Sequence, residues 1–210
     1  MKKKILLLAF YVLGLIATIA LIPALPAKIP FHWNFKGEVD SWAPAWNIIW
    51  MALLPIVLFL LLEFLPRIDP RKSSWELHKK SYAIIQVVIS FTFFLLNWVI
   101  IASSLKFPIR VDMFVFSLIG LLFIVLGNYM ATFRHNYFVG IRTPWTLANE
   151  EVWRKTHRQG GPAFIIMGAL LIAGSFIPNR IVGGIVSFSG FILIPWLVLY
   201  SYLVFRKLKA

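Results

Sequence analysis

Six long runs of apolar residues, separated by short polar stretches, constrain this chain more than any other feature of its sequence. They lie at 5–22, 46–65, 82–103, 113–133, 162–177 and 181–205. The hydrocarbon core of a bilayer is about 30 Å thick, and a helix needs roughly 20 apolar residues to cross it. Hydrophobic residues make up 60% of the chain and charged residues only 14%, which is more apolar surface than a soluble domain of 210 residues can bury. We therefore predict an all-α integral membrane protein, a bundle of six transmembrane helices.

The lysine and arginine residues between these runs predict how the bundle is oriented. One set of connections carries most of them: Lys2, Lys3, Lys4, Arg67, Arg71, Lys72, Lys79, Lys80, Arg134, Arg142, Arg154, Lys155, Arg158, Arg206, Lys207 and Lys209. The other set carries Lys28, Lys36, Lys106, Arg110 and Arg180. Cytoplasmic loops hold the excess of Lys and Arg, so we predict that both termini lie in the cytoplasm. The first run is longer than the apolar region of a signal peptide and lacks a good cleavage site, and we predict that it is a membrane anchor.

Several function classes are disfavoured by composition. The net charge is +13, but the basic residues form short clusters between apolar runs and not one basic face, so no direct nucleic-acid partner is predicted. The chain has no cysteine, which excludes thiolate and disulfide chemistry. His135, His157, Glu150 and Glu151 do not form an H-E-x-x-H pattern, so we predict no metal, no cofactor and no catalytic residue.

The longest polar interval runs from 128 to 161, and it is predicted to lie on the cytoplasmic side. Thr143-Pro144 is typical of a helix start, and Gly160-Gly161 predicts its end. Helical spacing places Trp145, Ala148, Asn149, Val152, Trp153 and Thr156 on one side and Glu150, Glu151, Arg154, Lys155 and Arg158 on the other. We predict a short amphipathic helix along the inner membrane surface, preceded by a basic and aromatic stretch at 134–142 that contacts anionic lipid headgroups rather than single-stranded nucleic acid.

The charged side of this helix has two interpretations. Glu150 with Arg154 and Glu151 with Lys155 are i,i+4 pairs of the kind that stabilise a solvated helix face. The same face, together with Arg142 and His157, could instead be a docking surface for a cytoplasmic partner. The sequence leaves both open.

The loop at 29–42, predicted to lie outside the cell, is the second candidate site. Pro30 fixes its own φ and Gly37 is free to adopt a positive φ, which together predict a structured turn. Its aromatic side chains either meet a hydrophobic ligand or only anchor the loop in the membrane interface. The candidate recognition residues are His32, Trp33, Asn34, Gly37 and Asp40.

Within the apolar runs, Gln86, Ser90 and Asn97 share one helix face, which predicts hydrogen bonds in the bundle interior. Glu63 lies near the inner end of the second run, one turn before Arg67, with which it is expected to pair. A path for coupled ions would normally carry ionisable residues at mid-membrane. The pattern therefore favours packing over ion-coupled transport.

Two motifs carry a family resemblance. From Gly127 onward, the pattern GNYM…R.NYF.GIRTPWTL.NEEVWRKTHR.GG resembles the signature of the SdpI family of bacterial membrane proteins. The segment IPFHWNFKGEVDSW at 29–42 is similar to the IP.HWN..G..D pattern of an N-terminal domain of unknown function that often precedes it. The resemblance implies an N-terminal two-helix segment at 1–81 and an SdpI-like segment at 82–210, in a multipass protein of the bacterial plasma membrane.

The family is named for an immunity protein against a secreted toxic peptide, so the resemblance implies protection from such a peptide, with signalling through a membrane-held transcriptional repressor as a second role. It also implies a cytoplasmic partner surface formed by the signature residues Asn128, Arg134, Asn136, Tyr137, Gly140, Arg142, Thr143, Pro144, Trp145, Asn149, Glu150, Trp153, Arg154 and His157. A small transporter or flippase of an amphipathic substrate, and a sensor of membrane stress, are the alternatives.

Overall fold

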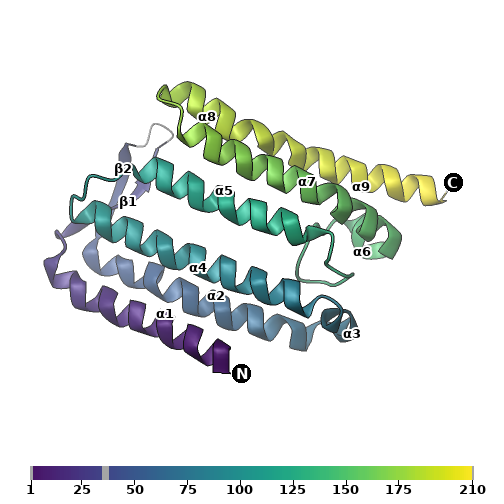
Figure 1. The fold of residues 1–210 in the computed structure, drawn as a ribbon, viewed down its shortest axis with the longest axis horizontal. Helices are drawn as coiled ribbons and strands as arrows, with labels where there is room; N and C mark the ends of the chain where they lie inside the picture. The colour runs from purple at the N-terminus through teal and green to yellow at the C-terminus, as the bar shows by residue number, and fades with distance from the viewer. Residues whose placement is uncertain (1, 35–37, 210) are drawn as a thin grey trace.

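The computed structural model describes residues 2–34 and 38–209 as a bundle of long helices lying side by side, with a small hairpin at one end (Figure 1). The long helices are α1 (Lys2–Leu21), α2 (Ile48–Ile68), α4 (Lys79–Ser104), α5 (Val111–Met130), α7 (Glu150–Ser175), α8 (Arg180–Ser189) and α9 (Leu193–Lys209). Short helices α3 (Lys72–Glu76) and α6 (Pro144–Ala148) and three 3₁₀ turns (Ile22–Ala24, Ala45–Asn47 and Gly190–Ile192) complete the helical part.

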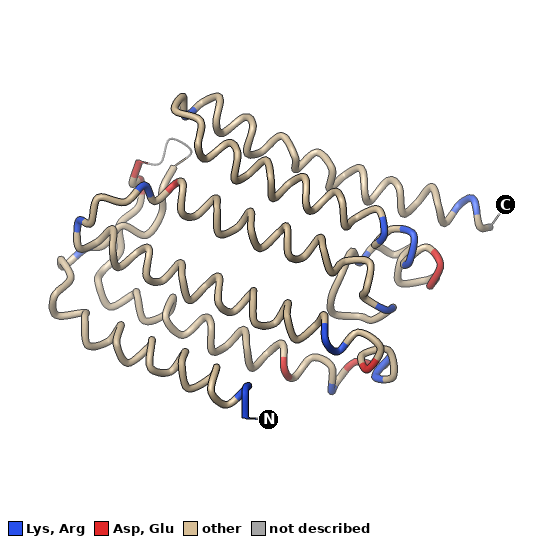
Figure 2. Tube along the Cα trace, viewed as in Figure 1, with Lys and Arg blue, Asp and Glu red and all other residues tan. Residues whose placement is uncertain are grey.

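Five helical segments among the described residues are long and apolar enough to cross a membrane. They are Lys2–Ala24, Ala45–Ile68, Lys79–Ser104, Val111–Met130 and Arg180–Leu208, the last containing both α8 and α9. Figure 2 shows that charged residues gather toward the two ends of the bundle and leave its middle almost free of them. The predicted class, an all-α membrane protein, agrees with this arrangement.

The extent of helix α7 differs from the one that the sequence predicted. The amphipathic segment and the fifth apolar run were expected to be separate, with Gly160-Gly161 between them, but α7 continues unbroken from Glu150 to Ser175. The two glycines serve packing instead of helix termination: Gly161 faces α5, and a Cβ on Gly160 would overlap the side chain of Ile141 in the loop. A Cβ built on Gly127 would lie 2.6 Å from the Gly161 carbonyl oxygen, and one on Gly120 would lie 2.6 Å from that of Gly168. Small residues at such positions let membrane helices approach closely, and here they bring α5 against α7.

The loop predicted as a structured turn forms an antiparallel hairpin of β1 (Lys28–Trp33) and β2 (Val39–Pro44). Ile29 pairs with Ala43 and Pro30 with Trp42, and the register shifts on either side of His32. A two-stranded ribbon tolerates Pro30 because each strand has a free edge. The sequence analysis predicted helices and a turn, so the two strands of this hairpin are the part of the fold that it did not predict.

The polar residues predicted to face the bundle interior do so. Gln86, Ser90 and Asn97 are all buried. The Asn97 amide donates to the Thr18 hydroxyl at 2.9 Å, and the Gln86 amide donates to the Phe59 carbonyl at 2.9 Å. These bonds tie α4 to α1 and α2, as side-chain hydrogen bonds between membrane helices do.

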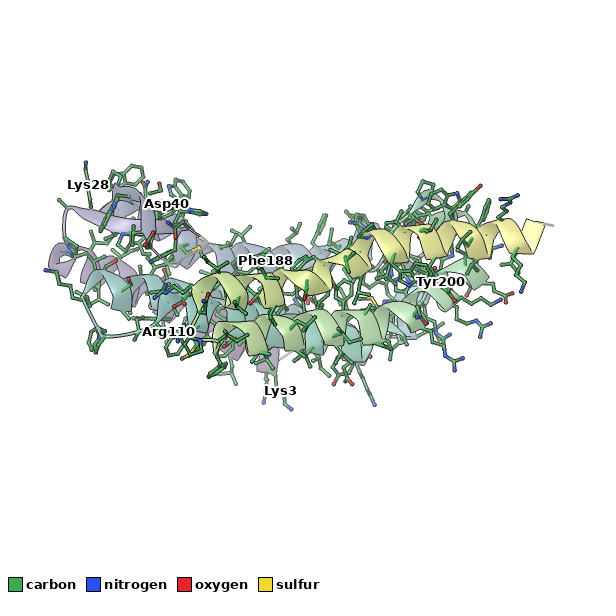
Figure 3. The ribbon with its side chains drawn as sticks, turned by 90° about the horizontal axis from the view of Figure 1, so that it is seen from above. Lys3, Lys28, Asp40, Arg110, Phe188 and Tyr200 are labelled. Carbon is green, nitrogen blue, oxygen red and sulfur yellow. The ribbon has the colours of Figure 1, made fainter. Side chains whose placement is uncertain are left out.

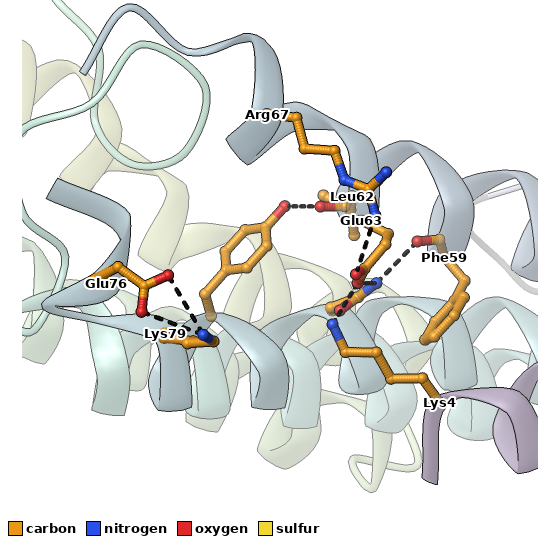
Figure 4. A network of polar contacts seen from close by, with 9 residues as sticks. Lys4, Phe59, Leu62, Glu63, Arg67, Glu76 and Lys79 are labelled. Carbon is orange, nitrogen blue, oxygen red and sulfur yellow. Dashed lines mark hydrogen bonds and ion pairs between the residues drawn. The ribbon is translucent and has the colours of Figure 1, made fainter. Parts of the chain in front are cut away.

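Glu63 is held at the edge of this interior by cations from two helices (Figure 4). Its carboxylate lies 3.9 Å from Arg67, the partner expected from the sequence, and 2.6 Å from Lys4 of α1. The Gln86 amide also donates to it, at 3.2 Å. Glu63 therefore joins α1, α2 and α4 in one polar contact.

Candidate functional site

A cavity of about 280 Å³ lies between the hairpin and the helices beneath it. We call it the hairpin pocket, and it is lined by Phe31, His32, Trp33, Asn34, Met51, Leu96, Val99, Ile100, Val111, Asp112, Val115 and Phe116. Its walls are mostly apolar side chains of α2, α4 and α5, with three polar residues among them. Ligand pockets start at about 300 Å³, so this one has room for part of a ligand, such as an apolar side chain of a peptide.

The hairpin is fixed over the pocket through the start of β1. Ile29 is fully buried and packs in a cluster with Leu25, Ile48, Ile100 and Ile101. Further along β1, Phe31 and His32 are exposed, while Trp33 is half-buried and packs against the same cluster. The strand is therefore held against the helices at both its start and its end.

Polar groups of the hairpin lie beside the pocket and pair across the two strands. His32 Nδ1 is 2.6 Å from an Asp40 carboxylate oxygen, and both side chains are exposed. The Asn34 amide donates to the Glu38 carboxylate at 3.0 Å. On the opposite wall Asp112 lies 3.0 Å from Arg110 and 3.8 Å from Arg180. Figure 3 shows Lys28, Asp40 and Arg110 at this same end of the molecule.

The structure places most of the recognition residues predicted for this loop at the pocket. His32, Trp33 and Asn34 line the pocket, and Asp40 contacts His32. Gly37 lies outside the described residues. The helical walls, including Val99, Asp112 and Val115, were not predicted, because nothing in the spacing of an apolar run indicates which of its residues faces a cavity.

At the other end of the bundle, the interval predicted as a partner surface folds into a buried polar structure. We call it the inner loop cluster, and its centre is Asp69, Arg71, His135, Asn136, Trp153 and His157. Asn136 is fully buried, and its side chain accepts from the backbone N–H groups of Phe138 and Val139 at 2.9 and 2.7 Å. Its amide donates to the carbonyls of Arg134 and Val139. All the hydrogen-bonding capacity of this side chain therefore shapes the loop.

Three aromatic rings stack in the middle of the inner loop cluster. The Trp153 ring lies 5.0 Å from His135 and 4.0 Å from His157, measured between centroids, and its indole N–H donates to the Phe133 carbonyl at 2.9 Å. His157 Nε2 accepts from the Ile141 N–H at 2.9 Å, so its proton is on Nδ1, which faces the Trp153 carbonyl. Burial lowers the pKa of His157 to about 4, and the ring is neutral at pH 7.

Gly140 allows the backbone to pass over this stack. Its φ is +123°, a backbone conformation that residues other than glycine rarely adopt. A Cβ at this position would also overlap His157 Nε2, at 2.2 Å. Gly140 is thus required for the loop to reach its hydrogen bond to His157.

Asp69 joins this loop to the N-terminal half of the chain. The residue is fully buried, and its carboxylate accepts from the backbone N–H groups of Arg71 at 2.7 Å and Tyr137 at 3.0 Å. The Arg71 guanidinium lies over the Tyr137 ring, 5.4 Å from its centroid, and contacts His135 Nδ1. The sequence did not point to Asp69, whose only signal was an acid in a mostly basic connection.

The predicted partner surface is wrong for four of its residues. Asn136, Thr143, Trp153 and His157 are buried and serve the fold. Of the others, Asn128, Arg134, Tyr137, Gly140, Arg142, Pro144, Glu150 and Arg154 are exposed, and Trp145 and Asn149 are half-buried. Arg142 is held in place because its guanidinium donates to the Tyr137 carbonyl at 2.9 Å.

The predicted amphipathic helix is also divided. Thr143 caps α6 as expected, accepting from the Thr146 N–H at 3.2 Å, but the helix ends at Asn149, which caps α7 by accepting from the N–H groups of Glu151 and Val152. Val152, Trp153 and Thr156, expected to face the membrane, are buried in protein. Glu151 pairs with Lys155 at 3.0 Å as predicted, while Arg154 pairs with Glu151, at 3.7 Å, and not with Glu150.

Comparison with known proteins agrees with the resemblance in both halves of the chain. Residues 132–201 match the model of the SdpI/YfhL protein family, and residues 9–60 match a domain of unknown function, DUF1648. The chain is 23% identical over all 210 of its residues to the Immunity protein SdpI of Bacillus subtilis (strain 168), covering 99% of that protein. No solved structure matches the chain in this comparison.

Proposed function

Because the chain is an SdpI-like membrane protein, we propose that it is a membrane immunity protein, which protects the cell from a secreted toxic peptide by binding it without catalysis. The similarity to an immunity protein over the full length supports the general role. The observation that carries the binding role is the hairpin pocket, a mostly apolar cavity beneath a hairpin with exposed aromatic and polar residues.

The proposed topology places the pocket where a secreted peptide arrives. In this topology α7 crosses the membrane with the five apolar segments, giving six crossings. Both termini and the inner loop cluster lie in the cytoplasm. The positive-inside distribution of Lys and Arg supports this orientation. The hairpin then lies at the outer surface, away from both termini (Figure 1).

The geometry suggests how a peptide would be held. An apolar side chain enters the pocket between Val99 and Val115, where its transfer from water is worth about 25 cal/mol per Å² buried. His32, Asn34 and Asp40 provide donors and acceptors for the polar backbone of the peptide at the rim. The hairpin binds the exposed part of the ligand, and the helices bind its apolar part.

A second role in signalling would use the inner end. Tyr137 and Arg142 are exposed there, and the Arg142 guanidinium donates a hydrogen bond to the Tyr137 carbonyl. A cytoplasmic transcriptional repressor could dock on this surface together with Arg134 and Arg154. Coupling to the hairpin pocket would require two arrangements of the bundle that the peptide binds unequally.

Survival of a sensitive bacterium under challenge with the secreted peptide tests the proposal. Val99→Trp and Val115→Trp fill the pocket and should abolish protection, whereas Val57→Trp, on an exposed position of α2, should protect like the wild type at equal membrane levels. Protection by both pocket variants would exclude the pocket as the binding site. If the wild type gives no protection, the immunity role fails, and peptide flux into proteoliposomes would then favour a transporter.

A further inference from the structure

Helix α9 carries two grooves that differ in charge. The first, which we call the lysine groove, has a volume of about 590 Å³ and is lined mainly by Lys155 of α7 and by Trp196, Tyr200, Leu203, Val204 and Lys207 of α9. The second, the aromatic groove, has about 550 Å³ and is lined by Trp145, Pro195, Val198, Leu199 and Tyr202. The described residues that line the aromatic groove include no cation. The two grooves therefore offer similar space with different chemistry.

The lysine groove is apolar along its length and cationic at one end. Trp196, Tyr200, Leu203 and Lys207 follow one another at helical spacing and share one face of α9. At a rise of 1.5 Å per residue, this face runs for roughly 16 Å from Trp196 to Lys207. Lys155 comes from the beginning of α7, which lies at the same end as the C-terminus of α9 (Figure 1). Tyr200, labelled in Figure 3, lies within the apolar part of this face, between Trp196 and Leu203 in the sequence.

The local charge balance favours an anion. Glu151 is the acid that pairs with Lys155, at 3.0 Å, and it also contacts Arg154. Lys207 forms no ion pair with any described residue. Glu151 therefore balances only one of the two lysines that line the groove, and the charge of Lys207 is not neutralised by a described acid.

From this arrangement we propose that the lysine groove binds an anionic phospholipid of the bilayer. An acyl chain lies along Trp196, Tyr200 and Leu203, and the headgroup phosphate lies between Lys155 and Lys207. A lysine near the surface of an anionic membrane is attracted to the negatively charged headgroups. Aromatic residues are enriched in the interfacial layer beside those headgroups. A bound lipid would join α9 to the start of α7, next to the inner loop cluster. This proposal does not depend on recognition of a toxic peptide.

Native mass spectrometry of the purified protein in detergent tests the proposal, with phosphatidylglycerol and phosphatidylcholine offered in equal amounts. We expect the wild type to retain phosphatidylglycerol preferentially. Lys155→Gln/Lys207→Gln should reduce the ratio of bound phosphatidylglycerol to phosphatidylcholine by about fivefold per lysine. The matched control is Lys79→Gln/Lys80→Gln, which removes two exposed lysines at the same end of the bundle and should leave the ratio unchanged.

A second pair of variants tests the apolar part of the groove. Leu203→Trp obstructs the lysine groove and should reduce retention of phosphatidylglycerol, whereas Leu199→Trp obstructs the aromatic groove and should not. The thermal unfolding midpoint of each variant confirms that it is folded. Equal loss in the Lys79/Lys80 control, or equal retention of the two lipids by the wild type, would overturn the proposal. So would a lipid-free dimer that Leu203→Trp disrupts, because the groove would then hold a second copy of the chain.

Discussion

The hairpin pocket and the inner loop cluster use polar residues in opposite ways. In the inner loop cluster, Asp69 and Asn136 are fully buried, and both bind backbone N–H groups. Beside the hairpin pocket, the His32 and Asp40 side chains are 69% and 42% exposed, and they contact each other. A buried polar group that loses its partner is costly, while an exposed ion pair contributes little to stability. The polar residues of the inner end therefore determine the fold, whereas those of the hairpin contribute little to its stability.

This difference also separates two kinds of signature residue. The inner interval carries the SdpI-like match, yet four of its predicted surface residues are internal supports. Its exposed residues, such as Arg142, are positioned by those supports through the loop backbone. Substitutions at the inner end should consequently change stability first, and substitutions at the hairpin should change ligand binding with little effect on stability.

The largest effect is expected for Trp153→Ala. The substitution removes a fully buried ring, its stacking with His135 and His157, and its hydrogen bond to the Phe133 carbonyl. We expect the free energy of unfolding to fall by about 3–5 kcal/mol, measured by denaturant titration in detergent. The control is Trp42→Ala, because Trp42 is exposed on β2. Equal losses for the two variants would remove the distinction between the two ends.

Asp69→Ala should have the next largest effect. It leaves the backbone N–H groups of Arg71 and Tyr137 without their acceptor, at a cost of about 2–4 kcal/mol in the free energy of unfolding. Asp40→Ala is the matched removal of an exposed carboxylate and should cost less than about 1 kcal/mol. Limited proteolysis would provide a second measurement, since the loop at 131–143 should become cleavable only in Asp69→Ala.

The pH dependence of stability should report the burial of His157. Its pKa is lowered to about 4 in the folded protein, whereas an unfolded histidine takes up a proton near pH 6.5. The stabilisation is therefore complete above pH 6.5 and is lost as the pH falls toward 4. At pH 5 the expected loss is about 2 kcal/mol relative to pH 7.5.

The contribution of His157 can be separated from those of His78 and His135, whose pKa values are also lowered by burial. His157→Gln keeps an acceptor for the Ile141 N–H but does not titrate. The difference in thermal midpoint between wild type and variant should therefore narrow as the pH falls from 7.5 to 5. A constant difference would mean that His157 is accessible to water.

The smallest effect on stability is expected for His32→Ala. It removes an exposed contact with Asp40 and should change the free energy of unfolding by less than about 0.5 kcal/mol. Protection from the secreted peptide should nevertheless fall, because His32 lines the pocket. A variant that is unstable and still protects would reverse the roles that we assign to the two ends.

Local patterns predicted what depends on nearby residues. Five of the six apolar runs, the Thr143 cap, the shared interior face of Gln86, Ser90 and Asn97, and the pair of Glu63 with Arg67 were predicted correctly. The hairpin was not, since its strands are short, contain Pro30 and shift register on either side of His32. Asp69 was missed because one of its partners, Tyr137, lies 68 residues further along the chain.

The amphipathic helix shows most clearly where sequence reasoning stops. Helical spacing correctly indicated that Val152, Trp153 and Thr156 lie together on a face that avoids water. An apolar face avoids water equally well against lipid or against protein, so the spacing could not show which of the two covers it.

The sequence by itself determined that this is a helical membrane protein, because the length and composition of each run decide whether a helix can cross a bilayer. The tertiary structure decided which faces of those helices meet one another, where the hairpin leaves a pocket and which signature residues are buried. Those outcomes depend on close packing between distant segments, such as Gly127 of α5 against Gly161 of α7, and no local pattern contains that information.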